Sequence, residues 1–201
     1  MRIFGKKKPA PEQTPKKNEN QPLSPSLQEN LKELRSVMQG CSDAVFKEFK
    51  FGHPATRGAI IFFDGLVDKH EVEINILKPL LLELNMQNND SGEFKHQNII
   101  NRIMDDILTI TELKKAEGFE ELYHHIASGD TVILIDGYPA GLAASTRAWQ
   151  GRPIQTPENE VMVFGPKEGF CETLRFNTAM LRRRIKSSRF KMESFVLGNI
   201  T

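Results

Sequence analysis

Side chains of the kind that bind divalent cations gather in one short segment, at Asp64, Asp68, His70 and Glu71. His70 and Glu71 also begin like the helix of a zinc protease, in which a second histidine follows four residues after the first. Ile74 occupies that position, so the second ligand is missing. Because helix capping accounts for Asp68 and Glu71, and turn formation for Asp64, we predict no metal site.

The other candidates for catalysis do not combine into a site. The sequence has no G-x-S-x-G, Walker A or G-x-G-x-x-G motif. His124 and His125 are adjacent, so they do not share a helix side. Cys41 and Cys171 lack metal-ligand spacing, which favours two reduced, packed thiols. We therefore predict no catalytic residues, no metal and no cofactor, and an enzyme is the weakest interpretation.

Composition narrows the class of protein further. The chain has 201 residues, enough for one or two small domains, and its 27 basic and 26 acidic residues argue against a nucleic-acid binder. No apolar run approaches the roughly 18 residues that cross a bilayer, and no signal-peptide pattern is present. On these grounds the sequence alone predicts a soluble domain.

Apolar periodicity predicts the elements that position these residues. Residues 1–23 are basic and proline-rich, which is typical of a disordered tail. A first α/β lobe over 24–92 would begin with a helix from Ser24-Pro25 to Gly40, followed by strands over 45–51 and 58–63. Its second helix would be capped by Asp68 and have a kink or break at Pro79. The predicted buried face of this second helix consists of Ile74, Leu77, Leu81 and Leu84. A connecting helix over 93–107 would follow.

The second half, 108–201, predicts a β-α-β-β-α-β lobe, so the fold class is α/β (α+β) with two mixed sheets. Its expected elements are a strand over 108–112, a helix over 119–129, strands over 131–135 and 142–149, a helix after Gly165-Pro166 and a strand over 190–197. The passages GAIIFFDGLVD and DTVILIDGYPA are alike, which hints at two similar lobes. Asp136 and Gly137 form the turn after the second passage.

The helix over 170–186 organises the second half. Its apolar residues recur at helical spacing and predict one buried face, made of Phe170, Leu174, Leu181 and Ile185. Asn177 lies on the same face, where its amide needs a hydrogen-bond partner. The basic residues occupy the other sides, at Arg175, Arg182, Arg183, Arg184 and Lys186. On pattern alone this is a surface helix with a solvated basic back.

The segment GPKEGF at 165–170, with Leu174, Asn177 and LRRRIK at 181–186, resembles a segment of the A subunits of GerA-type spore germinant receptors. The likeness extends back through GDTVILIDGYPAGLAASTRAWQGRPIQTPENE at 129–160 and more loosely to about residue 24. Phe164 departs from the pattern, which calls for a polar or basic residue before Gly-Pro. The resemblance makes Gly165, Pro166, Gly169, Phe170 and Asn177 family motif residues.

The resemblance implies the soluble N-terminal part of a subunit whose transmembrane region follows Thr201, located in the spore inner membrane. Its implied partners are the B and C subunits, other A subunits and the membrane, with no nucleic acid. Two functions stay open. In one, the domain couples receptor assembly and signal to the membrane part, through Arg182, Arg183 and Arg184. In the other, a cleft between the lobes binds a small nutrient through Tyr138, Thr146, Arg147 and Arg175.

Overall fold

The two similar passages form neighbouring strands of a single sheet. In this computed structural model, which describes residues 21–52, 55–86, 99–148 and 169–195, β2 (Thr56–Phe63) pairs antiparallel with β4 (Asp130–Ile135), with Ile60 opposite Ile133. Three further strands complete the sheet in the order β1-β2-β4-β5-β3, namely β1 (Ala44–Phe51), β3 (Leu113–Ala116) and β5 (Gly141–Ser145). Every strand pair is antiparallel.

The expectation of two separate sheets is therefore wrong for the described residues, because strands from both halves share one sheet. The physical reason lies in β2 and β4, which are apolar on both faces. A strand of this kind is stable inside a sheet, with a strand on either side and a helix layer on each face. Pairing β2 with β4 places both of them in the interior of one sheet. Period and composition show that a strand is buried but do not identify its neighbour.

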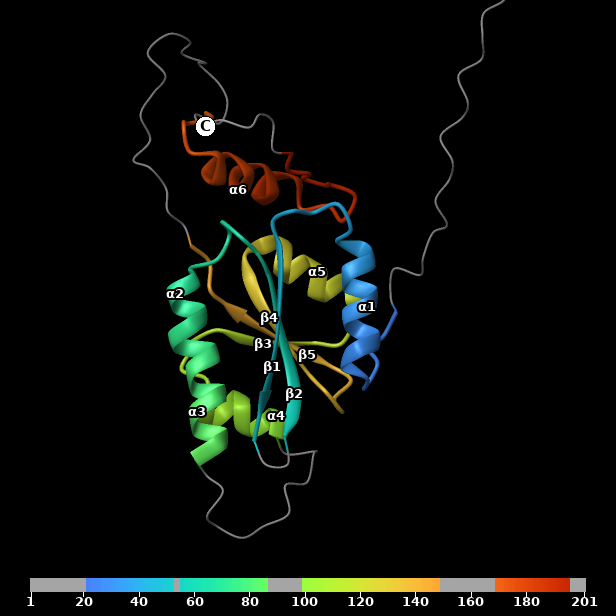
Figure 1. Cartoon of the computed structure of the whole chain (residues 1–201), viewed down its shortest axis with the longest axis vertical. Coiled ribbons are helices and arrows are strands. Elements are labelled where there is room, and N and C mark those ends of the chain that lie inside the picture. Colours follow the sequence, from blue (N-terminus) through green and yellow to red (C-terminus); the bar gives the residue numbers. More distant parts are fainter. Residues whose placement is uncertain (1–20, 53–54, 87–98, 149–168, 196–201) are drawn as a thin grey trace, which may run out of the picture.

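Helices cover both faces of the sheet, giving three layers (Figure 1). One face packs against α1 (Leu27–Val37) and α5 (Phe119–Ser128), through a core that includes Leu31, Ile61 and Ile126. The other face packs against two helices that each contain a π-helical turn: α2 (Lys69–Val72), η1 (Glu73–Leu77) and α3 (Lys78–Met86), then α4 (Ile99–Arg102) and η3 (Ile103–Ile107). The predicted connecting helix thus buries its isoleucines against the second face.

The kink expected at Pro79 takes the form of the π turn η1, which directly precedes α3. Proline lacks the amide that an α-helix needs at this point, and a π bulge accommodates the gap without ending the helix. The wider turn also changes which side faces the core. Ile74, predicted to be buried, is 42% exposed, while Val72, Ile76, Leu77 and Leu80 are buried.

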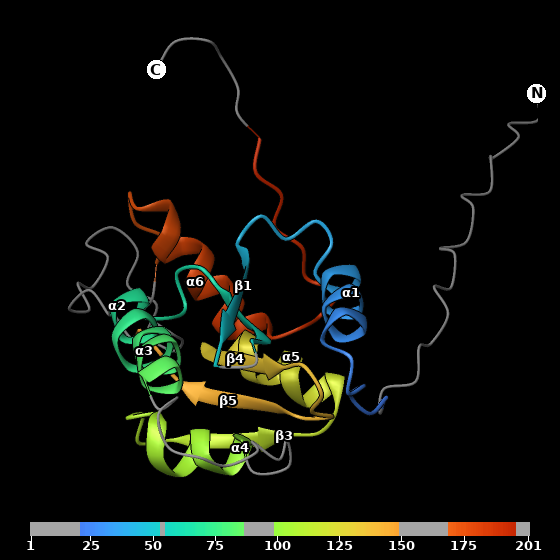
Figure 2. The same cartoon turned by 60° about the horizontal axis from the view of Figure 1, so that its bottom comes forward.

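Two predicted strands differ in the structure. The strand expected over 108–112 forms later, as β3, because pairing with β5 selects Leu113–Ala116. The strand expected over 190–197 is, within its described residues, an isolated parallel bridge between Met192 and Cys41. The helix over 170–186 forms α6 (Leu174–Ile185), which lies across one end of the sheet (Figures 1 and 2). None of the described helices is long and apolar enough to span a bilayer.

Candidate coupling site at helix α6

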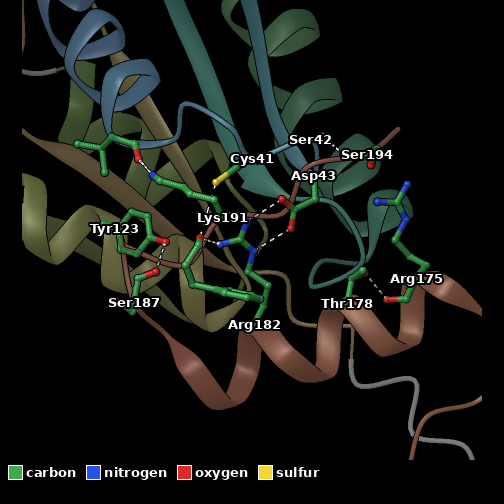
Figure 3. Close-up of polar contacts among 12 residues, drawn as sticks. Cys41, Ser42, Asp43, Tyr123, Arg175, Thr178, Arg182, Ser187, Lys191 and Ser194 are labelled. Atoms are coloured by element: carbon green, nitrogen blue, oxygen red, sulfur yellow. Dashed lines mark hydrogen bonds and ion pairs between the residues drawn. The ribbon is translucent and has the colours of Figure 1, made fainter. Parts of the chain in front are cut away.

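Arg182 of α6 is buried and forms a two-pronged ion pair with Asp43, at the turn between α1 and β1 (Figure 3). Its Nε donates to one carboxylate oxygen at 2.8 Å and its Nη2 to the other at 2.7 Å. The exposed fractions are 2% for Arg182 and 5% for Asp43. Sequence periodicity had placed Arg182 on a solvated basic side, so its burial is a correction.

Aromatic rings enclose the same guanidinium. Its central carbon lies 3.8 Å from the centre of the Phe63 ring and 5.1 Å from that of Phe190, within the range of cation–π attraction. Burial opposes the charged form, but the hydrogen bonds to Asp43 and the negative charge of its carboxylate outweigh it, so the pKa of Arg182 is raised. The arginine is therefore held charged inside the protein.

A second arginine of α6, Arg175, pairs with Asp64 at 3.0 Å, where Lys69 also pairs with that carboxylate. Arg175 and Arg182 are seven residues apart and so lie on the same helix side. Their partners are neighbours too, because the Asp64 amide donates to the Asp43 carbonyl at 2.8 Å. The helix is thus fastened at two points to the end of the β1–β2 ribbon.

The chain after α6 folds back onto the α1–β1 turn. We call residues 187–194 the strap. The Ser42 amide donates to the Met192 carbonyl at 2.8 Å, and the Ser194 amide donates to the Ser42 hydroxyl at 2.9 Å. The strap also accepts a bond from the Tyr123 hydroxyl at the Ser187 carbonyl, and Lys191 donates to the Val37 carbonyl. Arg182 joins helix and strap, since its Nη1 donates to the Phe190 carbonyl at 3.0 Å.

Asn177 fixes the start of α6. Its side-chain oxygen accepts from the Cys171 amide at 2.8 Å, and its nitrogen donates to the Cys171 carbonyl at 2.6 Å. Both polar atoms of the amide are therefore satisfied, as the sequence required of this residue. Gly169 is the first residue of the last described range, and Gly165 and Pro166 lie outside the described residues.

A third aspartate–arginine pair lies at the same end of the sheet. Asp130, 3% exposed, accepts from Arg147 Nε at 2.7 Å and lies 2.8 Å from His125 Nδ1. Sequence reasoning missed this cluster, because its members come from α5, β4 and the residues after β5. The signal available in the sequence was Asp130 itself, a carboxylate at the start of an apolar strand.

The four residues proposed for nutrient binding do not converge. Thr146 shares a buried hydrogen bond with Thr131, and Arg147 is held by Asp130. Both lie at the α6 end of the sheet with Arg175. Tyr138 follows β4 and therefore lies at the opposite end, beside Asp136 and Gly137.

The turn after β4 anchors α1. The Asp136 carboxylate accepts from the Leu27 amide at 3.0 Å and pairs with Arg57, and the Gly137 amide donates to the Pro25 carbonyl at 2.8 Å. Gly137 has φ +86°, which favours glycine. The turn role predicted for these two residues is present in the structure.

The apolar side of α6 predicted to be buried is largely exposed. Phe170, Leu174 and Ile185 are 68%, 74% and 44% exposed and Leu181 is half-buried, while Ala179 and Arg182 face the protein. The carboxylates of Asp43 and Asp64 bind two arginines of α6 and so fix which side of the helix faces the sheet. The apolar residues lie on a different side of the helix. Of the other predicted contact residues, Arg183 is half-buried and Arg184 is exposed.

Among the described residues, no three histidine, cysteine, aspartate or glutamate side chains group as metal ligands do. A shallow acidic hollow lies at the start of α5, lined by Pro22, Glu117, Gly118, Glu120, Glu121 and His124. The fold and the site together define an α/β domain in which α6 and the strap are fastened to one end of the sheet.

The comparisons with known proteins identify the family. Residues 32–201 match the family described as Bacillus/Clostridium GerA spore germination protein, and the chain belongs to this family. The family is not known as one of enzymes. The chain is 33% identical to an uncharacterized membrane protein YfkQ of Bacillus subtilis, over 92% of this chain and 34% of that protein. It is 29% identical to spore germination protein KA of the same species, over 89% of this chain and 32% of that protein.

A solved structure matches as well. It is the N-terminal domain of the A subunit of the Bacillus megaterium spore germinant receptor GerK3, with 26% identity and a TM-score of 0.68. The match covers 90% of this chain and 63% of that one. The chain thus spans about a third of the length of the curated relatives and less than two thirds of the solved domain.

Proposed function

We propose that this chain is part of the N-terminal region of a germinant receptor A subunit and couples receptor assembly and the nutrient signal to a membrane part. Family membership and the likeness to the GerK3 domain support the receptor assignment. The B and C subunits of the same receptor, and other A subunits, are its proposed partners. The spore inner membrane is its proposed location, in keeping with a relative named as a membrane protein.

The observation that carries the coupling role is the attachment of α6 and the strap. Arg182 ties the helix, the strap and the α1–β1 turn together around Asp43. A displacement of the strap would act on this attachment, because Arg182 is bonded to the Phe190 carbonyl of the strap. A displacement there would reach the sheet directly, because Asp43 immediately precedes β1. The exposed Arg184, with its half-buried neighbour Arg183, would face acidic partner surface or lipid headgroups.

A reversible lock on the strap tests this role. Cys41 and Met192 are bridge partners, so Met192→Cys would place a thiol opposite the native one, and a disulfide needs Cα atoms about 4.4–6.8 Å apart. In spores carrying Met192→Cys at the natural locus, oxidation should slow nutrient-triggered germination and a reductant should restore it. The matched control combines Met192→Cys with Cys41→Ser, which cannot form the bond. Unchanged germination with the disulfide verified by mass spectrometry would refute coupling through the strap.

The nutrient-binding alternative has less support, because Tyr138 lies far from Thr146 and Arg147, and the guanidinium of Arg147 is already bound by Asp130. It stays a testable prediction: NMR titration of the N-terminal region with amino acids and sugars should shift resonances of these residues if they bind a nutrient. Absence of shifts at millimolar ligand, a concentration equivalent to roughly 4 kcal/mol of binding, would leave coupling as the better account.

A further inference from the structure

Strand β1 forms one edge of the sheet and presents a row of open backbone groups. β1 and β3 lie at opposite edges, and β1 has eight residues where β3 has four (Figure 2). The Asp64 amide donates to the Asp43 carbonyl, and hydrogen-bonded pairs alternate along antiparallel strands. The amides and carbonyls of Phe46, Glu48 and Lys50 therefore point away from β2, and no described strand lies on that side. Such an edge is able to pair with a further strand.

Charged side chains restrict which strand can pair with this edge. Lys47, Glu48 and Lys50 are exposed, and charges on an edge strand, those of lysine above all, prevent indiscriminate pairing. Like charges directly opposite each other destabilise a strand pair, and opposite charges stabilise it. Glu48 pairs with Arg35 at 3.1 Å, but both side chains stay about half exposed, and Lys50 forms no ion pair with another described residue. The edge therefore favours a strand whose charges run in the reverse order.

A second copy of β1 meets this requirement in one register. Two antiparallel copies related by a two-fold axis place one residue opposite itself. With Phe49 on the axis, Glu48 of each copy lies opposite Lys50 of the other, which makes two attractive pairs. An axis at Lys47, Glu48 or Lys50 would instead place that charge opposite its own copy.

The strap excludes the registers centred earlier in β1. An axis at Val45 or Phe46 would bring the partner strand beside Ser42, where the strap is already hydrogen-bonded. An axis at Phe51, the last residue of β1, would leave few residues to pair. The register centred on Phe49 uses residues 47–51, which lie at the end of β1 away from the strap.

We propose that β1 is a self-association surface, through which two copies of this chain pair about a two-fold axis at Phe49 and form one continuous sheet. The axis brings two half-buried Phe49 rings together, each 5.7 Å from the Phe51 ring of its own copy, and aromatic pairs across strands are favourable. The contact gives the proposed association of A subunits a defined surface, and in that respect it rests on the proposed function. Its small size makes it a weak, reversible contact.

Charge reversal tests the register. Glu48→Lys or Lys50→Glu alone places like charges opposite each other twice, so each variant should dimerise at least about tenfold more weakly than the unaltered chain. An equimolar mixture of the two variants restores opposite charges at both positions and should recover the dimer. Lys114→Glu, on the exposed edge strand β3, is the matched control and should leave dimerisation unchanged. Sedimentation velocity over a concentration series measures the association, and circular dichroism verifies that each variant is folded.

A disulfide across the axis is a second measurement. In a chain carrying Cys41→Ser and Cys171→Ser, Phe49→Cys should form an intermolecular disulfide on oxidation. The reason is that opposite residues of a non-hydrogen-bonded pair have Cα atoms about 4.5 Å apart, within disulfide range. Lys47→Cys is the control, because Lys47 would lie opposite Phe51 and too far from its own copy to cross-link.

Three results would overturn the proposal. The first is an unaltered chain that stays monomeric up to about 1 mM. The second is a mixture of Glu48→Lys and Lys50→Glu that dimerises no better than either variant alone. The third is cross-linking through Lys47→Cys as fast as through Phe49→Cys. None of these measurements depends on germination, so a monomeric chain in spores that the strap disulfide blocks would refute this contact and leave coupling standing.

Discussion

Arg182 and Asp43, which are 139 residues apart in the sequence, meet as a buried two-pronged ion pair between α6 and the α1–β1 turn. The Arg182 guanidinium lies against the Phe63 and Phe190 rings and also holds the strap through the Phe190 carbonyl. One side chain thus joins α6, the strap and the α1–β1 turn.

Arg182→Ala should lower the free energy of unfolding by about 3–5 kcal/mol, because Asp43 would stay buried without its partner. Urea unfolding of the N-terminal region followed by circular dichroism measures this. Arg183→Ala, at the adjacent half-buried position, should change stability by no more than about 0.5 kcal/mol. Equal effects of the two substitutions would show that the ion pair contributes little.

Arg175→Ala should lower the free energy of unfolding much less, by about 1 kcal/mol or below, although it also removes an ion pair with an aspartate. The Arg175 side chain is 53% exposed, so water screens its attraction to Asp64 and solvates the carboxylate left behind. The same unfolding experiment at low and high salt tests whether solvent exposure weakens the pair between Arg175 and Asp64. The loss should shrink at high salt for Arg175→Ala and persist for Arg182→Ala; the reverse order would contradict the assigned burial.

Asn177→Ala should destabilise the domain by about 1–2 kcal/mol, since both hydrogen bonds to the Cys171 backbone are lost. Asn177→Leu should have a similar effect, because leucine has no polar atom to replace them. Thermal unfolding gives the magnitude, and hydrogen exchange at Cys171 gives the location. Thr178→Ala is the control, since its exposed hydroxyl bonds only locally to the Arg175 carbonyl. An unchanged melting temperature for both Asn177 variants would show that these two hydrogen bonds do not stabilise the domain.

Stability should fall at alkaline pH in part through Tyr123. Burial raises the pKa of Tyr123 above its ordinary value of 10.0, so the unfolded chain ionises first. The contribution of Tyr123 to the free energy of unfolding is therefore fully present below pH 10 and is lost as the pH rises above that value. Tyr123→Phe should be less stable at neutral pH by about 1 kcal/mol, through the lost bond to the Ser187 carbonyl. Its stability should nevertheless decline less steeply above pH 10, and identical slopes would refute the assignment.

The sequence by itself determined the local elements. Leu27, Leu31 and Leu34 predicted α1, and Gly129, with φ +94°, ends α5 where the pattern placed its end. The two Asp-Gly passages predicted two buried strands and the turn at Gly137. These features follow from neighbours a few residues apart, through helical spacing, capping and the freedom of glycine to adopt positive φ.

Only the tertiary structure decided which surfaces meet. It joined β2 and β4 in one sheet, and it turned α6 so that Arg182 is buried and Leu174 is exposed. Periodicity reports that a helix has an apolar side, but a carboxylate such as Asp43, distant in the sequence, can bind the other side more strongly. Because ion pairing and strand pairing depend on residues brought together by folding, a local pattern could not predict either outcome.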